Sequence, residues 1–186
     1  MEDNNYKTAL KLLLQAIRDG KRNHELHLTL GVTPPALLHL GLPALPLTIS
    51  AKAIDKCHFD HGVTENTLAR LYGLVANPAT VFKSDSPHLQ GKAVDAVVVV
   101  TVEDKAGNPL LVALHVNMQV GRSCVNQIKS VYDKPAEMLV KWRDKGLVIW
   151  DRPAAPAEKA TVTPIKASAA QAAPMVMVKR SRLTKS

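Results

Sequence analysis

The longest hydrophobic segments of the chain lie in its middle and have the composition of β-strands. Residues 94–102 are rich in β-branched side chains, and residues 109–116 repeat the pattern after a polar turn at residues 104–108. The two runs predict a β-hairpin. Because their apolar residues are nearly continuous, we expect both faces of the hairpin to be covered, as at the centre of a sheet.

Apolar residues at helical spacing predict helices on either side of this hairpin. Residues 4–19 place Tyr6, Leu10 and Ile17 on one face and end at Gly20, which suits a helix stop. By the same criteria a helical turn is expected at 33–41 and helices at 51–57, 64–77 and 135–145.

Short β-rich runs at 47–49, 80–82 and 147–150 supply further strands. We therefore predict an α+β fold with an antiparallel four- to five-stranded sheet. The N-terminal helices are expected to pack on this sheet, and helix 135–145 to lie at its edge.

The charge of the chain favours a polyanionic partner, because the formal net charge is +8 over 186 residues. Residues 151–186 account for +5 of it, are rich in Ala and Pro, and predict a disordered basic tail over 153–186. Aromatic residues make up only 4% of the chain, which disfavours a surface that stacks single-stranded bases.

The sequence shows no sign of export or membrane insertion. It has only two cysteines, Cys57 and Cys124, and no signal peptide at its start, so we expect a reducing, cytoplasmic location. No window approaches the roughly 18 apolar residues that a membrane-spanning helix needs.

A polar segment directly after the hairpin is the first candidate site. Here donors and cations lie beside the most hydrophobic part of the chain, where a rigid scaffold could hold a site: Asn126, Lys129, Ser130, Tyr132 and Lys134.

A histidine-rich segment is the second candidate. Cys57, His58, Asp60 and His61 suggest zinc, but a single such cluster lacks a second pair, and only distant Cys124 or His88 could complete it. We therefore expect no metal and no other cofactor. Nucleophilic catalysis by Cys57 or Cys124 is disfavoured too, since most such cysteines are buried and inert.

Several short blocks follow one another along the chain. They are Leu30-Gly31-Val32-Thr33-Pro34, Leu38, Leu40-Gly41, Leu47-Thr48-Ile49, Lys56, His61-Gly62-Val63, Asn77-Pro78, Val81-Phe82-Lys83-Ser84, Val125-Asn126-Gln127-Ile128-Lys129-Ser130-Val131-Tyr132, Trp142 and Gly146-Leu147. In this order they resemble the phage MuF C-terminal domain family over about residues 28–152, with residues 1–27 as a preceding helical segment.

The resemblance implies a protein of a phage or conjugative element that acts in a bacterial host cell. Such domains look like relatives of metal-independent nuclease toxins of the barnase, EndoU, colicin and RelE-like group. The partners implied are nucleic acid, RNA above all, or an acidic host protein, and an immunity protein. Fold resemblance does not by itself establish such an activity.

Metal-independent RNA cleavage needs an acid, a base and groups that stabilise phosphorane charge. The resemblance suggests His61 as acid or base and Lys56 as charge stabiliser, with Ser130 and Tyr132 completing the catalytic set. The substrate-binding residues suggested are Ser84, Asn126, Lys129 and Lys134.

Two other interpretations stay open. In the first, His61 caps or precedes the helix that begins at Thr64, Asn126 and Ser130 satisfy backbone groups of turns, and Tyr132 belongs to the core. In the second, the domain is a non-catalytic binding or inhibitor protein on the same scaffold. Asp60 favours the latter, because the family pattern tends to have a basic residue before the histidine.

Overall fold

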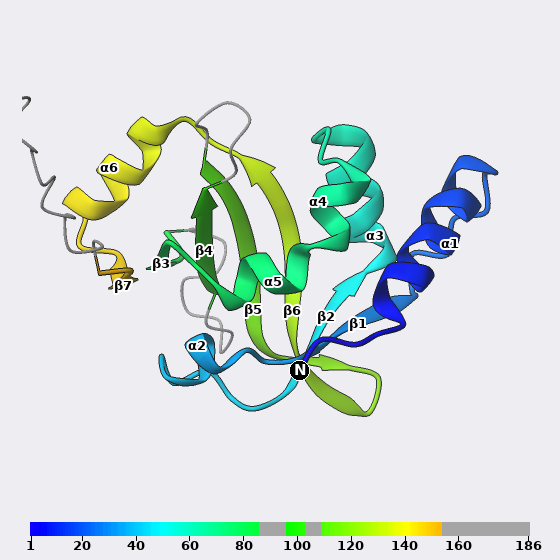
Figure 1. The fold of residues 1–186 in the computed structure, drawn as a ribbon, viewed down its shortest axis with the longest axis horizontal. Coiled ribbons are helices and arrows are strands. Elements are labelled where there is room, and N and C mark those ends of the chain that lie inside the picture. The colour runs from blue at the N-terminus through cyan, green and yellow to red at the C-terminus, as the bar shows by residue number, and fades with distance from the viewer. Residues whose placement is uncertain (86–95, 103–108, 154–186) are drawn as a thin grey trace, which may run out of the picture. The chain divides into compact units, whose positions relative to one another are not determined.

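The computed structural model describes residues 1–85, 96–102 and 109–153, and the central hairpin is present as predicted (Figure 1). Its strands β4 (Ala96–Val102) and β5 (Pro109–Val120) pair in antiparallel register from Ala96↔His115 to Val102↔Pro109. The predicted turn at 104–108, His88 and the tail from residue 154 lie outside the described residues.

In the described part of the chain seven strands form one mixed sheet in the order β1-β2-β6-β5-β4-β3-β7, so β5 is central. The strands flanking the hairpin are β1 (His27–Val32), β2 (Pro46–Ser50), β6 (Ser123–Asp133), β3 (Thr80–Lys83) and β7 (Val148–Asp151).

The fold is α+β as predicted, but the prediction of four to five antiparallel strands is wrong in two respects. The sheet has more strands, and β2 pairs with β6 in parallel from Leu47↔Asn126 to Ile49↔Ile128. Strand β6 escaped prediction because its polar residues Gln127, Lys129 and Ser130 hide the apolar alternation by which a half-buried strand is recognised.

Six α-helices and one π-helix accompany the sheet within the described part of the chain. They are α1 (Tyr6–Arg18), α2 (Pro35–Leu38), α3 (Ala51–Asp55), the π-helix η1 (Lys56–Asp60), α4 (Glu65–Ala69), α5 (Leu71–Ala76) and α6 (Ala136–Asp144). The helix predicted over 64–77 is thus two helices that meet at Arg70, where φ is −97° and ψ is 5°.

The main core lies between the N-terminal helices and one face of the sheet. Tyr6, Leu10 and Leu14 of α1 belong to the same buried cluster as Leu114 of β5 and Ile128 of β6. Helices α3, α4 and α5 add side chains to this cluster as well. The expected packing of N-terminal helices on the sheet is therefore present.

A smaller core lies on the other face, toward the β3 and β7 edge. Phe82, Val98 and Leu111 are buried there, and Leu139 and Trp142 of α6 pack against them. The rings of Phe82 and Trp142 meet edge to face with centroids 5.4 Å apart. Helix α6 thus lies at the end of the sheet away from α1 (Figure 1), close to the predicted place.

None of the described helices is long and apolar enough to cross a membrane.

Candidate functional site

Two predicted site residues from distant parts of the chain meet at the end of β6. His61 directly follows the π-helix η1 and is exposed, and its ring centroid lies 6.1 Å from that of Tyr132 at an interplanar angle of 55°. The structure therefore places an imidazole beside a phenol, although no hydrogen bond joins them directly.

Two lysines contact this pair, one through its side chain and one through its backbone. The Nζ atom of Lys134 lies 5.6 Å from the centre of the Tyr132 ring, within the range of a cation–π contact. Lys56 is exposed at the start of η1, and its carbonyl accepts a hydrogen bond of 3.1 Å from the His61 amide. The Lys134 ammonium makes this end of the sheet suited to an anion.

Burial sets the protonation of the phenol. Tyr132 is half-buried at the margin of the smaller core, and this desolvation raises its pKa above the ordinary value, because a buried phenolate loses the hydration of its charge. At neutral pH Tyr132 is therefore a neutral hydrogen-bond donor.

Ser130 lies in the same region but faces a cysteine. Cys57 of η1 is fully buried, and its thiol interacts with both the Val131 amide and the Ser130 side chain. Burial raises the pKa of the thiol despite the opposing effects of these hydrogen bonds and of Lys56. Cys57 is thus a structural thiol that anchors η1 to β6.

Lys129 occupies a β-bulge and belongs to another polar group. The pairing shifts between Ala113↔Ser130 and Leu114↔Ile128, which leaves Lys129 as the extra residue of β6. Its ammonium donates to the Gln127 side-chain oxygen at 3.0 Å, and the Gln127 amide nitrogen lies 3.0 Å from Nδ1 of His27.

Asn126 is engaged entirely within the protein. Its side chain is fully buried, donates to the Thr33 hydroxyl at 2.7 Å and the Pro43 carbonyl at 2.9 Å, and accepts from the Asn117 amide at 3.1 Å. These bonds join the segment between β1 and β2 to strand β5. Asn126 is therefore not part of the candidate site.

Ser84 is also remote from the His61–Tyr132 pair. It follows Lys83, which stands in register with Val97, whereas Tyr132 is in register with Leu111. Strands β6 and β3 are separated by two others, so roughly 14 Å lies between them, and Ser84 is at the opposite end of the strands.

The comparison with protein families decides what kind of domain this is. The model of the phage MuF C-terminal domain matches residues 52–153, which is more than half of the chain. The chain belongs to this family. No curated protein and no solved structure matches it. The predicted family is therefore confirmed, while the likeness to nuclease toxins stays a prediction.

The family match spans α3 to β7 and so includes all eight predicted site residues of the MuF domain. Four of these lie together at the end of β6: Lys56, His61, Tyr132 and Lys134. Ser130 lies in the same region, where its side chain contacts Cys57. Lys129 lies further along the same strand. Asn126 and Ser84 do not join them.

His58 of the histidine-rich segment makes contacts within the MuF domain. The ring nitrogen Nδ1 of His58 lies 2.8 Å from the Val63 carbonyl, and the His58 ring meets Phe59 edge to face. Among the residues that the structure describes, no group of three or more His, Cys, Asp and Glu side chains could hold a metal ion.

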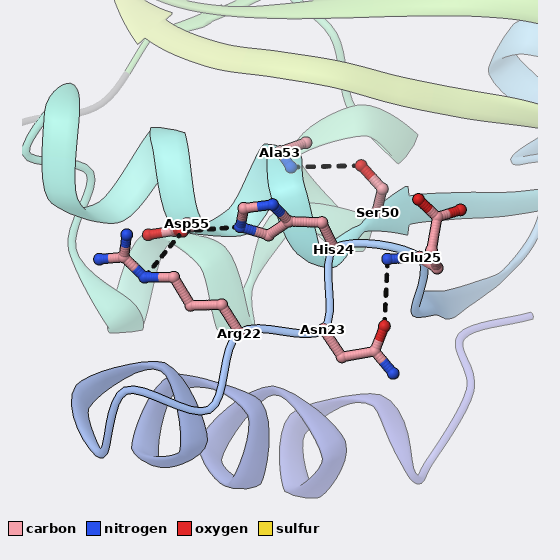
Figure 2. A network of polar contacts seen from close by, with 7 residues as sticks. All are labelled: Arg22, Asn23, His24, Glu25, Ser50, Ala53 and Asp55. Carbon is pink, nitrogen blue, oxygen red and sulfur yellow. Dashed lines mark hydrogen bonds and ion pairs between the residues drawn. The ribbon is translucent and has the colours of Figure 1, made fainter.

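A polar network joins the α1–β1 connection, which precedes the family match, to Asp55 of α3 within it. Arg22 Nε and His24 Nε2 lie 3.5 and 3.2 Å from the same oxygen of Asp55, whose side chain is 13% exposed (Figure 2). The figure shows both side chains converging on this carboxylate. The network fixes the start of β1, the strand that carries His27.

Sequence reasoning missed four polar side chains that strand register brings side by side. Thr29↔Thr48, Thr48↔Gln127 and Gln127↔His115 are neighbours on β1, β2, β6 and β5. Nothing in the spacing of these residues along the chain signals this row. Only the pairing of strands distant in sequence, including the parallel pair, creates it.

Proposed function

We propose that this MuF domain cleaves RNA without a metal ion, by acid–base chemistry at His61 and Tyr132. The proposal rests on the contact between the two rings, which brings together an exposed imidazole and a neutral phenol from separate elements. The Lys134 ammonium beside Tyr132 and the net charge of +8 support an anionic substrate.

The chemistry assigns one proton to each group. The neutral His61 imidazole takes the proton of an RNA 2′-hydroxyl, whose oxygen attacks the adjacent phosphorus. As the bond from phosphorus to the 5′ oxygen breaks, Tyr132 gives its proton to that oxygen. The products are a 2′,3′-cyclic phosphate and a 5′-hydroxyl, and water and buffer restore the two side chains.

The remaining residues support this reaction without exchanging protons. Lys56 and Lys134 stabilise the negative charge that develops on the phosphorane, an electrostatic role that a nearby ammonium fulfils. Ser130 acts as a positioning residue, since its contact with Cys57 fixes the end of β6 against η1.

The test is incubation of the purified chain with total cellular RNA in the presence of a chelator. We expect His61→Ala and Tyr132→Phe each to reduce cleavage by about 10²-fold or more, as loss of an acid–base group does. His39→Ala, which removes an exposed imidazole at the end of α2, is the matched control and should cleave normally. Undiminished cleavage in both site variants would contradict the proposal.

A second candidate function is binding without cleavage, to RNA or to an acidic host protein. Two observations favour it: Asp60, directly before His61, is exposed, and Tyr132 is partly packed into the smaller core. Intact RNA in every lane, together with binding that depends on Lys56 and Lys134, would support this function over catalysis.

A further inference from the structure

We propose that the sheet face opposite the main core binds the phosphodiester backbone of nucleic acid. The site is the polar row formed by Thr29, Thr48, Gln127 and His115, extended by His27 and Lys129. For the choice of nucleic acid, the inference rests on the proposed function. The polar row itself plays no part in the proton transfers proposed above.

Strand alternation places the polar row on one face. The preceding or following residues Leu28, Ile49, Ile128 and Leu114 are all buried in the main core beneath the N-terminal helices. Because successive side chains of a strand point to opposite faces, the row points away from those helices. On this same face α6 packs against the apolar region of β3 and β4.

An unsatisfied hydroxyl lies in the middle of the row. Thr48 is 5% exposed, and within the described residues its Oγ1 is the one buried side-chain oxygen or nitrogen without a hydrogen-bond partner. Leaving such a group unpaired destabilises a fold, so its retention calls for an explanation. A phosphate oxygen that accepts from this hydroxyl provides one.

Neighbouring side chains supply a cation and further donors. Lys129 Nζ donates to Gln127 at 3.0 Å, and Gln127 lies 3.0 Å from His27, so the three groups form a connected chain. Lys129 is exposed, and its contact with Gln127 shows that the bulge brings its ammonium to this face of the sheet.

The chemistry of the row selects an anion. It offers hydroxyls, an amide, imidazoles and an ammonium, and no carboxylate stands among these residues. The four strands span three inter-strand spacings, about 14 Å, which exceeds the size of one phosphate group. A chain of phosphates therefore fits the row better than a single small anion.

The test uses a fluorescently labelled single-stranded DNA oligonucleotide, which lacks the 2′-hydroxyl and so resists the proposed cleavage. Fluorescence anisotropy at several salt concentrations gives the Kd and its salt dependence. We expect Lys129→Met to weaken binding several-fold and to reduce the slope of log Kd against log salt by about 1, as loss of one phosphate contact does. Lys11→Met is the control: it removes the same charge at an exposed position of α1 and should change the Kd less.

Thr48→Val separates a ligand-binding role from a structural one. Removing the unsatisfied hydroxyl should raise Tm by about 2–4 °C for each kcal/mol that its burial costs, while the affinity for the oligonucleotide falls. Thr48→Ser keeps the hydroxyl and should retain the affinity. A purely structural threonine would not produce a more stable protein that binds less well.

Wild-type binding by both Thr48→Val and Lys129→Met would overturn the inference, whatever the outcome for RNA cleavage. Conversely, loss of cleavage in His61→Ala with unchanged oligonucleotide binding would leave the polar row in place. If Thr48→Val fails to fold, Lys129→Met still decides, because Lys129 is exposed and the substitution keeps its aliphatic stem.

Discussion

The backbone amide of Val131 donates a hydrogen bond of 3.1 Å to the thiol sulfur of Cys57. Strand β2 pairs with β6 only as far as Ile128, so among the described residues no strand lies beside the next part of β6 on that edge. The π-helix η1 takes this place, and the sulfur accepts from an amide that would otherwise be buried without a partner. This contact also holds His61 near Tyr132.

Cys57→Ala should therefore destabilise the domain by about 1–3 kcal/mol, the cost of leaving a buried donor unsatisfied. The measurement is urea-induced unfolding followed by circular dichroism. Cys124→Ala, at an exposed position, is the matched control and should change the free energy of unfolding by about 0.5 kcal/mol or less. Equal effects of the two substitutions would show that the Cys57–Val131 contact contributes little.

The two thiols should also differ in reactivity. Burial keeps Cys57 protonated and out of reach, whereas Cys124 is exposed. We expect a thiol reagent such as iodoacetamide to modify one cysteine in the native protein, identified as Cys124 by mass spectrometry, and both in urea. Rapid native modification of Cys57 would contradict a closed contact between η1 and β6.

Sequence patterns predicted the parts of the fold that carry strong apolar periodicity. The hairpin and the helix beginning near Tyr6 are present because each buries a continuous set of apolar side chains. The helix ending before Gly146 is present as well, although Leu139 and Trp142 are only partly buried against the smaller core. Strand β6 was not recognised as a strand, since Gln127 and Lys129 belong to a polar row that exists only once β2 lies parallel to β6.

The candidate site was predictable to a similar degree. His61 and Tyr132 could be selected from the sequence as candidate site residues, and the fold brings their rings together. Asn126 was indistinguishable from its neighbours in the sequence, but it is buried and fully bonded. Whether such a side chain is buried or available to a ligand depends on contacts with residues far away in the sequence, which local sequence patterns do not reveal.

A cluster of Arg143, Asp151 and Thr80 should make stability depend on pH. Arg143 binds both carboxylate oxygens of Asp151, and the Thr80 hydroxyl donates to the same carboxylate at 2.6 Å. Hydrogen bonds from Arg143 and then Thr80 hold the pKa of Asp151 below its ordinary value. The stabilisation is therefore present above the unfolded pKa near 3.9 and lost as pH falls through the lower folded pKa.

Asp151→Asn tests this dependence. Both partners are more than a third exposed, so solvent screening limits the contribution to about 1 kcal/mol or less. In urea unfolding, the variant should be slightly less stable at pH 7 and should lose less stability than the wild type between pH 5 and 2. Parallel acid profiles for the two proteins would show that the cluster does not contribute.

The buried phenol of Tyr6 predicts a loss of stability at alkaline pH. Its hydroxyl donates to the Leu68 carbonyl at 3.0 Å, and burial raises its pKa well above the ordinary value. The folded state therefore favours the neutral phenol, and this contribution is present below the unfolded pKa near 10 and lost as pH rises above it.

Tyr6→Phe should cost about 1–2 kcal/mol at pH 7, because the Leu68 carbonyl loses its partner in the core. Between pH 9 and 11 the variant should lose less stability than the wild type. A smaller alkaline dependence will persist, since burial also raises the pKa of Tyr72 and Tyr132. An unchanged alkaline profile would mean that Tyr6 ionises as easily in the folded as in the unfolded chain.

Gly31 is the position in β1 where a side chain cannot be accommodated. Its φ of +150° is rarely adopted by other residues, and an added Cβ would collide with the Met1 carbonyl and lie 3.0 Å from the Tyr72 ring. The backbone of residues 1–3 runs this close because Asp3 donates to Leu30 and Val32 donates to Met1. We expect Gly31→Ala to destabilise the domain by about 2–4 kcal/mol through backbone strain and overpacking.

Gly73→Ala is the matched control, since it makes the same substitution with the opposite expected sign. Gly73 lies in α5, has an ordinary φ and has open space where the Cβ would be. Alanine should therefore stabilise this helix by up to about 1 kcal/mol. Thermal unfolding of the two variants decides the matter: a Gly31→Ala protein as stable as the wild type would show that the N-terminal residues can leave β1 without cost.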